Sequence, residues 1–338
     1  MKATFSLSAA IAFAIVACDP AEIPMPKAGG AMPGKTPLRT DVQVDTPPGD
    51  PLGPKPEVAV PPPFAPPTPS VYTTKSGLKV WLVERHALPI VAVDIAIPYG
   101  SASDPKGKEG LSFITAAMLD EGAGTRGALD LARAVDLLGA TLRTGTNADW
   151  AHASLSVLKR NLAPAMDLLG DVVVRPRFEA AEFKRVHDLW ENDLKQRASD
   201  PDEVAAVVTQ AALFGEGHPY AHPPDGLLGP AQKITLDDAK KAYAERWRPD
   251  MASIVVVGDV SRAEIDPLLD KALGDWKKPA AAPPEVPNPG APRGSFGKVV
   301  LVDRADAPQA VIAVARAGVA AVDADAPRLT RANIALGG

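Results

Sequence analysis

Residues that could coordinate a metal ion or attack a substrate are few in this sequence. It contains five histidines and one cysteine. His218 and His222 are four residues apart, the spacing at which two imidazoles on one helical face can share a metal ion. Pro219, Pro223 and Pro224 exclude a helix there, because proline lacks the backbone N–H and its ring clashes with the preceding turn. The pair therefore predicts a loop and not a metal site.

The other three histidines are scattered along the chain (His86, His152 and His187). A metal site formed by His187 together with the 215–230 loop is an alternative that their positions leave open. The sequence has no G-x-S-x-G, Walker or dinucleotide-binding motif. Serine-hydrolase and nucleotide-binding functions are therefore not expected.

The single cysteine, Cys18, ends an N-terminal segment that reads as an export signal. Met1 and Lys2 give a short positive start, and residues 6–17 are an apolar run of signal-peptide length, shorter than the ~20 residues of a membrane-spanning helix. The residues just before Cys18 resemble a bacterial lipobox. This resemblance implies cleavage before Cys18, its acylation, and a lipid-anchored protein facing the periplasm of a bacterial cell envelope. The alternative is an ordinary secretory signal with an incidental cysteine.

The chain as a whole has the composition of a globular protein joined to proline-rich segments. Hydrophobic residues make up 46% and charged residues 23% of the 338 positions, and the net charge of -5 does not favour nucleic acid as a partner. Residues 19–70 hold 16 of the 36 prolines and predict an extended, disordered tether. A second proline-rich stretch at 279–293 predicts a linker. A folded domain is expected at 71–278, and the start of another at 294–338.

Apolar periodicity and turn residues predict mixed strands and helices in the first domain. Strands are expected at 78–84, 90–97, 140–146, 150–158 and 252–257, and helices at 110–120, 128–138, 162–174, 180–197, 201–214, 236–247 and 262–273. The strands and helices do not alternate regularly, so the predicted fold class is α+β with a mostly antiparallel sheet packed by helices.

The sequence also repeats itself across the second linker. KVWLVER at 79–85 is matched by KVVLVDR at 298–304, an offset of 219 residues without a gap. A proline follows the arginine at the same distance in both copies, and alternating apolar residues come next (Val91, Val93 and Ile95 against Ala310, Ile312 and Val314). The match predicts a duplicated domain whose second copy is truncated.

The helix expected at 110–120 lies in GLSFITAAMLDEGAGT, and this stretch resembles the first helix of the pitrilysin/insulinase family of zinc metallopeptidases, the inverzincins. The duplicated domain, the Gly110-Leu111 start, Asp200-Pro201 and the His218-Pro219-Tyr220 loop support this resemblance. It implies a metallohydrolase-type fold with H-x-x-E-H on this helix, two histidines binding Zn²⁺ and a glutamate as general base.

All three chemical positions of that motif are changed here. Phe113 takes the place of the first histidine, Ala116 that of the glutamate and Ala117 that of the second histidine. Neither residue type offers a lone pair. The family's third ligand is a glutamate some 70–80 residues later, where either Glu191 or Asp193 matches; both are interpreted as solvated helix residues. The resemblance also implies that His218, Pro219 and Tyr220 shape the structure around the site.

Together these features predict a protein that is not catalytic by itself. Bacterial members of the family often occur as pairs, in which one subunit carries the zinc motif and the other closes the chamber around the substrate. We therefore expect a non-catalytic subunit that binds no cofactor, pairs with a zinc-bearing subunit, contacts peptide substrate and reaches the membrane through its lipid anchor. The alternatives are a peptidase-derived binding or scaffold protein of the cell envelope and a zinc peptidase with relocated ligands.

Overall fold

The computed structural model describes residues 63, 65–292, 294, 299–304 and 309–336. The predicted signal peptide, Cys18 and nearly all of the predicted tether lie outside these residues. Among the described residues, no helix has both the length and the apolar character that crossing a membrane requires.

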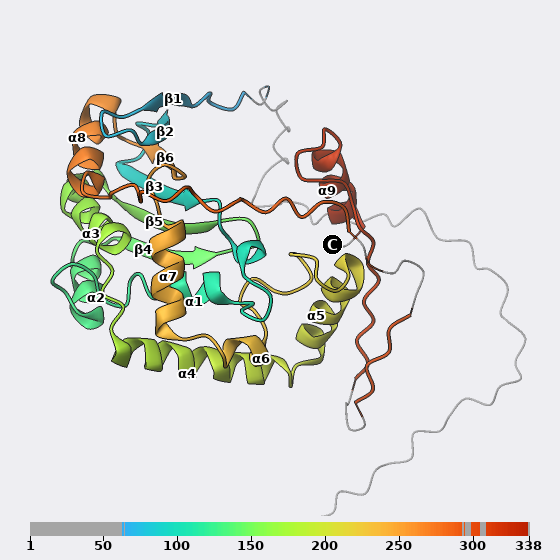
Figure 1. Ribbon diagram of the computed structural model, residues 1–338. Helices are drawn as coiled ribbons and strands as arrows, with labels where there is room; N and C mark the ends of the chain where they lie inside the picture. Colours follow the sequence, from blue (N-terminus) through green and yellow to red (C-terminus); the bar gives the residue numbers. More distant parts are fainter. Residues whose placement is uncertain (1–62, 64, 293, 295–298, 305–308, 337–338) are drawn as a thin grey trace, which may run out of the picture. The chain divides into compact units, whose positions relative to one another are not determined.

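A six-stranded sheet forms the centre of the domain (Figure 1). Its strands are β1 (Ser70–Thr73), β2 (Lys79–Glu84), β3 (Ile90–Ile97), β4 (Thr141–Thr146), β5 (Ala151–Leu158) and β6 (Ser253–Gly258). They lie in the order β1-β2-β6-β3-β5-β4, and only the β2–β6 pair is parallel. The predicted α+β class with a mostly antiparallel sheet is confirmed.

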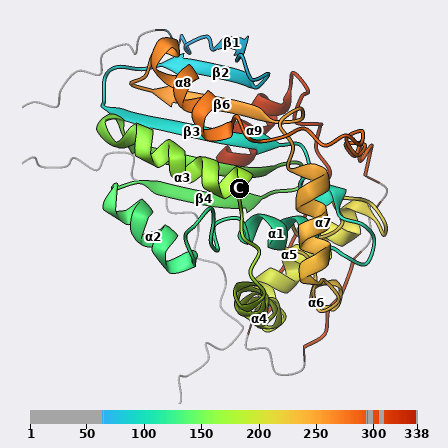
Figure 2. The same cartoon turned by 60° about the vertical axis from the view of Figure 1, so that its left-hand side comes forward.

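The two faces of the sheet differ because successive side chains on a strand point to opposite sides. On β3, Val91, Val93, Ile95 and Ile97 are buried in the main core. Helices α2 (Ala128–Leu137), α3 (Leu162–Val174) and α8 (Arg262–Leu273) lie over this face (Figure 2). The opposite face, called here the outer face, carries the intervening residues of the same strands.

The remaining helices of the domain gather near the β4 edge (Figure 2). They are α1 (Leu111–Ala117), α4 (Ala180–Arg197), α5 (Pro201–Phe214), α6 (Leu228–Ala231) and α7 (Leu236–Arg246). All of them except α5 contribute residues to a second, smaller core. Helix α1 packs against α7, α4 and the two strands at this edge. Its Leu111 and Ile114 are buried with Trp190 and Leu194 of α4.

Several helix starts follow from local sequence. Asp200 accepts hydrogen bonds from the N–H groups of Asp202 and Glu203, with Pro201 at the first helical position of α5. Thr235 and Asp238 form a capping box at the start of α7. These caps explain why α5 and α7 start at the predicted residues.

The C-terminal segment, which holds the second copy of the repeat, forms little regular structure. Residues 299–304 and 309–320 have no regular secondary structure. In the first copy, β2 and β3 both pair with β6, and β3 pairs with β5. The counterparts of β5 and β6 would be numbered above 338 and so lie outside the residues that the structure describes. Helix α9 (Ala326–Ala335) forms at the counterpart of 107–116, overlapping the counterpart of α1.

Candidate functional site

Helix α1, where the family resemblance places a zinc site, starts at a glycine that no other residue could replace without strain. Gly110 has φ of 107°, in the left-handed region. A Cβ atom there would lie 2.5 Å from Cζ2 of Trp190 on α4. The close approach of α1 to α4 therefore depends on the missing side chain.

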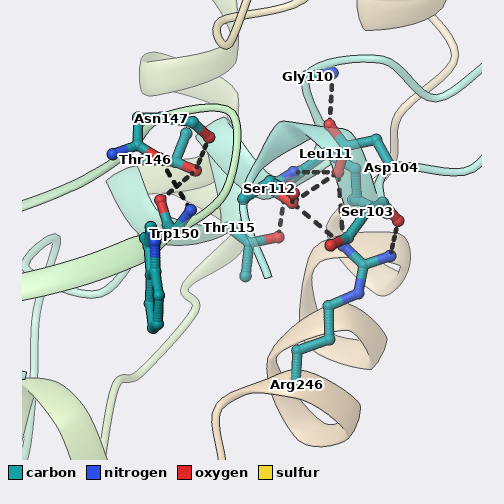
Figure 3. Close-up of polar contacts among 11 residues, drawn as sticks. Ser103, Asp104, Gly110, Leu111, Ser112, Thr115, Thr146, Asn147, Trp150 and Arg246 are labelled. Carbon is teal, nitrogen blue, oxygen red and sulfur yellow. Dashed lines mark hydrogen bonds and ion pairs between the residues drawn. The ribbon is translucent and has the colours of Figure 1, made fainter. Parts of the chain in front are cut away.

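The start of α1 is held by Asp104, eight residues before Ser112 (Figure 3). Its carboxylate accepts hydrogen bonds from the N–H of Gly110 at 2.9 Å, the N–H of Ser112 at 2.9 Å and the hydroxyl of Ser112 at 2.6 Å. Asp104 thus satisfies backbone donors that an N-cap side chain satisfies in other helices. Burial raises the pKa of Asp104, and the hydrogen bonds from Ser112 and Gly110 oppose this effect.

Arg246, at the end of α7, joins the same network (Figure 3). Its guanidinium donates to the carbonyl oxygen of Ser103 at 2.8 Å and to the Ser112 hydroxyl at 3.1 Å, and it lies 3.4 Å from Asp104. The Asp104 side chain has no solvent exposure. Arg246 therefore supplies the positive charge next to a fully buried carboxylate and ties α1 to α7.

The β4–β5 turn braces the segment that precedes α1. The N–H groups of Gly100, Ser101 and Ala102 donate to carbonyl oxygens of the turn at 2.9–3.1 Å. The turn itself is closed by the Asn147 side chain, which accepts from two backbone N–H groups (Figure 3). A Cβ on Gly100 would lie 2.3 Å from a turn carbonyl, so this contact also requires glycine.

The His218-Pro219-Tyr220 loop contacts the same turn. The Tyr220 hydroxyl donates to Asp149, and burial and this hydrogen bond raise the pKa of Tyr220 to about 12. Nδ1 of buried His218 accepts the backbone N–H of Tyr220 at 3.0 Å. The loop is thus linked through Asp149 to the turn that braces α1. His218 and His222 lie in a loop and not in a helix, as their prolines predict.

The three positions of the zinc motif hold packing residues. The Phe113 ring lies 5.5 Å from the Trp190 ring, measured between centroids. Ala116 is completely buried in the main core, and Ala117 is half-buried. None of the three side chains carries a nitrogen or oxygen atom, so these positions do not fit Zn²⁺, which needs N, O or S ligands.

The acids considered for the third ligand position lie on α4. Glu191 is half-buried, lies 3.4 Å from His187 and forms an ion pair with Lys195 at 3.2 Å, whereas Asp193 is exposed. Nε2 of His187 lies 3.0 Å from the carbonyl oxygen of Ala231. Across the part of the chain that the structure describes, no group of three histidine, cysteine, aspartate or glutamate residues could hold a metal ion. The geometry therefore gives no support to a metal site built on His187.

Sequence reasoning missed three residues that shape this region. Trp190 is the α4 residue that contacts α1, while Asp104 and Arg246 form the buried network at its start. A tryptophan on the apolar side of a helix was a readable signal. The pairing of Asp104 with Arg246 joins residues 142 positions apart, so no local pattern indicated it.

Comparisons with known proteins identify relatives of this chain. A sequence model described as "Insulinase (Peptidase family M16)" matches residues 79–219, and one described as "Peptidase M16 inactive domain" matches residues 233–338. An uncharacterized zinc protease of Mycobacterium leprae is 26% identical over 60% of this chain and 45% of its own length. A non-peptidase homolog of Helicobacter pylori is 27% identical over 56% of this chain and 44% of its own.

The solved structures include a similar fold. The crystal structure of a peptidase M16 inactive domain from Pseudomonas fluorescens superposes with a TM-score of 0.61 at 28% identity, covering 67% of this chain and 54% of that one. The chain spans about half the length of the curated relatives it matches.

Proposed function

This chain belongs to the insulinase/pitrilysin (M16) peptidase family, and from that membership we propose that it is a non-catalytic subunit of a heterodimeric zinc metallopeptidase. In this proposal it forms part of a peptide-binding chamber, and the partner subunit supplies H-x-x-E-H and the zinc ion. The carrying observation is that Phe113, Ala116 and Ala117 fill the three motif positions with side chains that can neither bind a metal nor accept a proton.

The packing around these positions supports this proposal. Ala116 lies in the main core and Phe113 contacts Trp190, so the helix is stabilised by apolar contacts. Gly110, Asp104 and Arg246 still fix the start of the helix. A helix that keeps its position but lacks the reacting groups fits a role in forming the chamber wall. A relative whose printed name is non-peptidase homolog agrees with such a role.

Reconstitution tests the proposal directly. The full chain is purified alone and together with an H-x-x-E-H protein of the same family from the same organism, and cleavage of an unstructured peptide is measured. We expect cleavage only by the pair, and its loss when the partner's motif glutamate is changed to glutamine. Zinc-dependent cleavage by this chain alone, or full activity of the partner alone, contradicts the proposal.

A second candidate is a peptidase-derived binding or scaffold protein. It is favoured if no gene next to the gene for this chain encodes a protein with H-x-x-E-H. A third, a zinc peptidase with relocated ligands, is tested by metal analysis of the purified chain. One bound zinc per chain supports it, and a metal-free chain that binds peptide contradicts it.

We further propose that Cys18 is acylated and anchors the protein to a bacterial envelope membrane, facing the periplasm. The supporting observation is the lipobox-like sequence that ends at this only cysteine. Expression of the full chain and of a Cys18→Ala variant, followed by detergent phase partitioning, tests the anchor. We expect only the unaltered chain to enter the detergent phase; equal partitioning of both contradicts acylation.

A further inference from the structure

The outer face of the sheet contains a hollow of about 220 Å³. Its lining comes from adjacent strands: Asp94 of β3 lies between Ser154 of β5 and Val255 of β6. The other side chains of the lining that point to this face are small or β-branched (Ala92, Thr141, Ser156 and Val257). The hollow exists because alanine and serine stand where larger residues would fill the face. Val255 and Val257 remain 38% exposed beside it.

Asp94 brings an unsatisfied charge into this hollow. Its Oδ1 atom is buried and has no hydrogen-bond partner within the described part of the chain. Burial raises the pKa of Asp94. Buried polar atoms in native proteins nearly always have a partner, so this orphaned carboxylate oxygen calls for a donor that the described residues do not supply. The carboxylate itself can only accept hydrogen bonds when ionised.

The charged groups around Asp94 leave it available. His152 lies diagonally across from it on β5 and lowers its pKa, but no ion pair joins the two among the described residues. Arg143 is exposed on β4, on the far side of Ser154. On β2, Lys79 places its ammonium 5.1 Å from the centre of the Trp81 ring. No basic residue of the described chain forms an ion pair with Asp94.

The chemistry of the lining selects the ligand. Asp94, Ser154 and Ser156 offer oxygen acceptors, and a primary ammonium group carries three N–H donors and no acceptor. Val255 and Val257 offer an apolar wall for an alkyl stem, which lysine buries while its charged end seeks polar groups. An anionic ligand would meet the Asp94 charge. On the same face, Trp81 of β2 lies next to Val255. Peptide residues on either side of the lysine would therefore also find apolar contacts.

We propose that this hollow binds the lysine side chain of an extended peptide, with the ammonium group on Asp94 and the alkyl stem along Val255 and Val257. The proposal concerns this domain alone. It requires neither a partner subunit nor proteolysis, so its failure and the failure of the proposed heterodimer are separate results.

Binding of two labelled peptides to the full chain tests the proposal. The peptides are identical, short and apolar except for a central lysine in one and norleucine, which has the lysine side chain without its ammonium group, in the other. Fluorescence anisotropy gives their affinities. We expect the lysine peptide to bind about tenfold more tightly, the size of effect that a hydrogen-bonded charge contributes. Equal affinities, or no binding of either peptide, would overturn the proposal.

Two variants locate the site. Asp94→Asn keeps the shape but removes the charge, and we expect it to abolish the preference for lysine. Ala92→Leu keeps the charge but fills the hollow, and we expect it to weaken binding of both peptides. The matched control is Asp136→Asn, which removes the same charge from an exposed position on α2. A preference for lysine that survives Asp94→Asn, or that Asp136→Asn removes equally, contradicts this site.

Discussion

The ring of Phe113 on α1 stands 5.5 Å from the ring of Trp190 on α4, with the two planes tilted by 37°. In zinc-bearing members of the family, the resemblance places the first histidine ligand at the position of Phe113. Here an aromatic contact joins the two helices at that place. Aromatic pairs in this distance range stabilise a fold beyond the area they bury. The contact between α1 and α4 is therefore expected to contribute to stability without any metal.

Replacing Phe113 by alanine tests this contribution. We expect Phe113→Ala to lower the free energy of unfolding by about 2 kcal/mol, less than for a fully buried phenylalanine because Phe113 is half-buried. Urea unfolding measures the change. Leu129→Ala on α2, at a side chain that is 63% exposed, is the control and should cost less than about 0.5 kcal/mol. Similar losses in both variants would contradict a specific role for the Phe113–Trp190 contact.

Restoring the family's glutamate on α1 should damage the fold. Ala116 has no solvent exposure, so Ala116→Glu forces a carboxylate into the main core. We expect a loss of about 3 kcal/mol in the free energy of unfolding at neutral pH. Ala117→Glu adds the same group one residue later at a half-buried position, and we expect about 1 kcal/mol or less. Equal costs in urea unfolding would show that the core does not exclude a charge at residue 116.

The helices and strands of the first domain were predictable because their signals are local. Val91, Val93, Ile95 and Ile97 alternate with smaller or polar residues, and Asp200-Pro201 is a readable helix start. The family resemblance then indicated where α1 lies and which residues fill the motif. The parallel β2–β6 pair could not be read in this way, because it joins residues more than 170 positions apart.

The outer face of the sheet shows a different limit of the sequence. Asp94 is in the expected place for a polar residue in an alternating strand, and such a residue is normally solvated. Its buried oxygen results from packing between β5 and β6, which strand periodicity does not describe. Likewise, residues 299–304 repeat the residue types of β2 without forming a strand, because a strand also needs partners for its backbone hydrogen bonds.

The pH dependence of stability should reveal the burial of Asp94. Its pKa is raised from the ordinary value of 3.8, so the folded state favours the protonated carboxyl. The cost of ionising it is absent below about pH 4 and grows as the pH rises through the folded pKa. We expect Asp94→Asn to be more stable than the unaltered chain at pH 7, by about 1 kcal/mol because the side chain is only half-buried. The difference in stability should vanish near pH 3. Urea unfolding at pH 7 and pH 3 measures it. An equal difference at both pH values would contradict a raised pKa of Asp94 in the folded state.

The four tyrosines should titrate late in the folded protein. The pKa values of Tyr72, Tyr99, Tyr220 and Tyr243 are all raised, mainly by burial, and that of Tyr220 reaches about 12. Because the phenols ionise near pH 10 in the unfolded chain, stability is retained below that pH and falls as the pH rises toward the folded values. Tyrosinate absorbance should therefore rise at a higher pH in buffer than in denaturant. Coincident titration curves would contradict the burial of these side chains.

A buried charge, the carboxylate of Asp104, lies next to α1. Arg246→Ala leaves Asp104 without its cationic neighbour, and we expect a loss of about 3 kcal/mol in the free energy of unfolding. Arg246→Lys keeps a charge but lacks the planar group that reaches both Ser103 and Ser112, so its loss should be smaller. Arg133→Ala, at a side chain that is 66% exposed on α2, is the control.

A double-mutant cycle separates the charge from the packing. Adding Asp104→Asn to Arg246→Ala removes the uncompensated carboxylate, so the double variant should lose less stability than the sum of the two single variants. Asp104→Asn alone also weakens the hydrogen bonds at the start of α1, because an amide presents one oxygen where the carboxylate presents two. Strictly additive losses in urea unfolding would mean that Arg246 stabilises the chain through its contacts with Ser103 and Ser112, and that its charge does not act on Asp104.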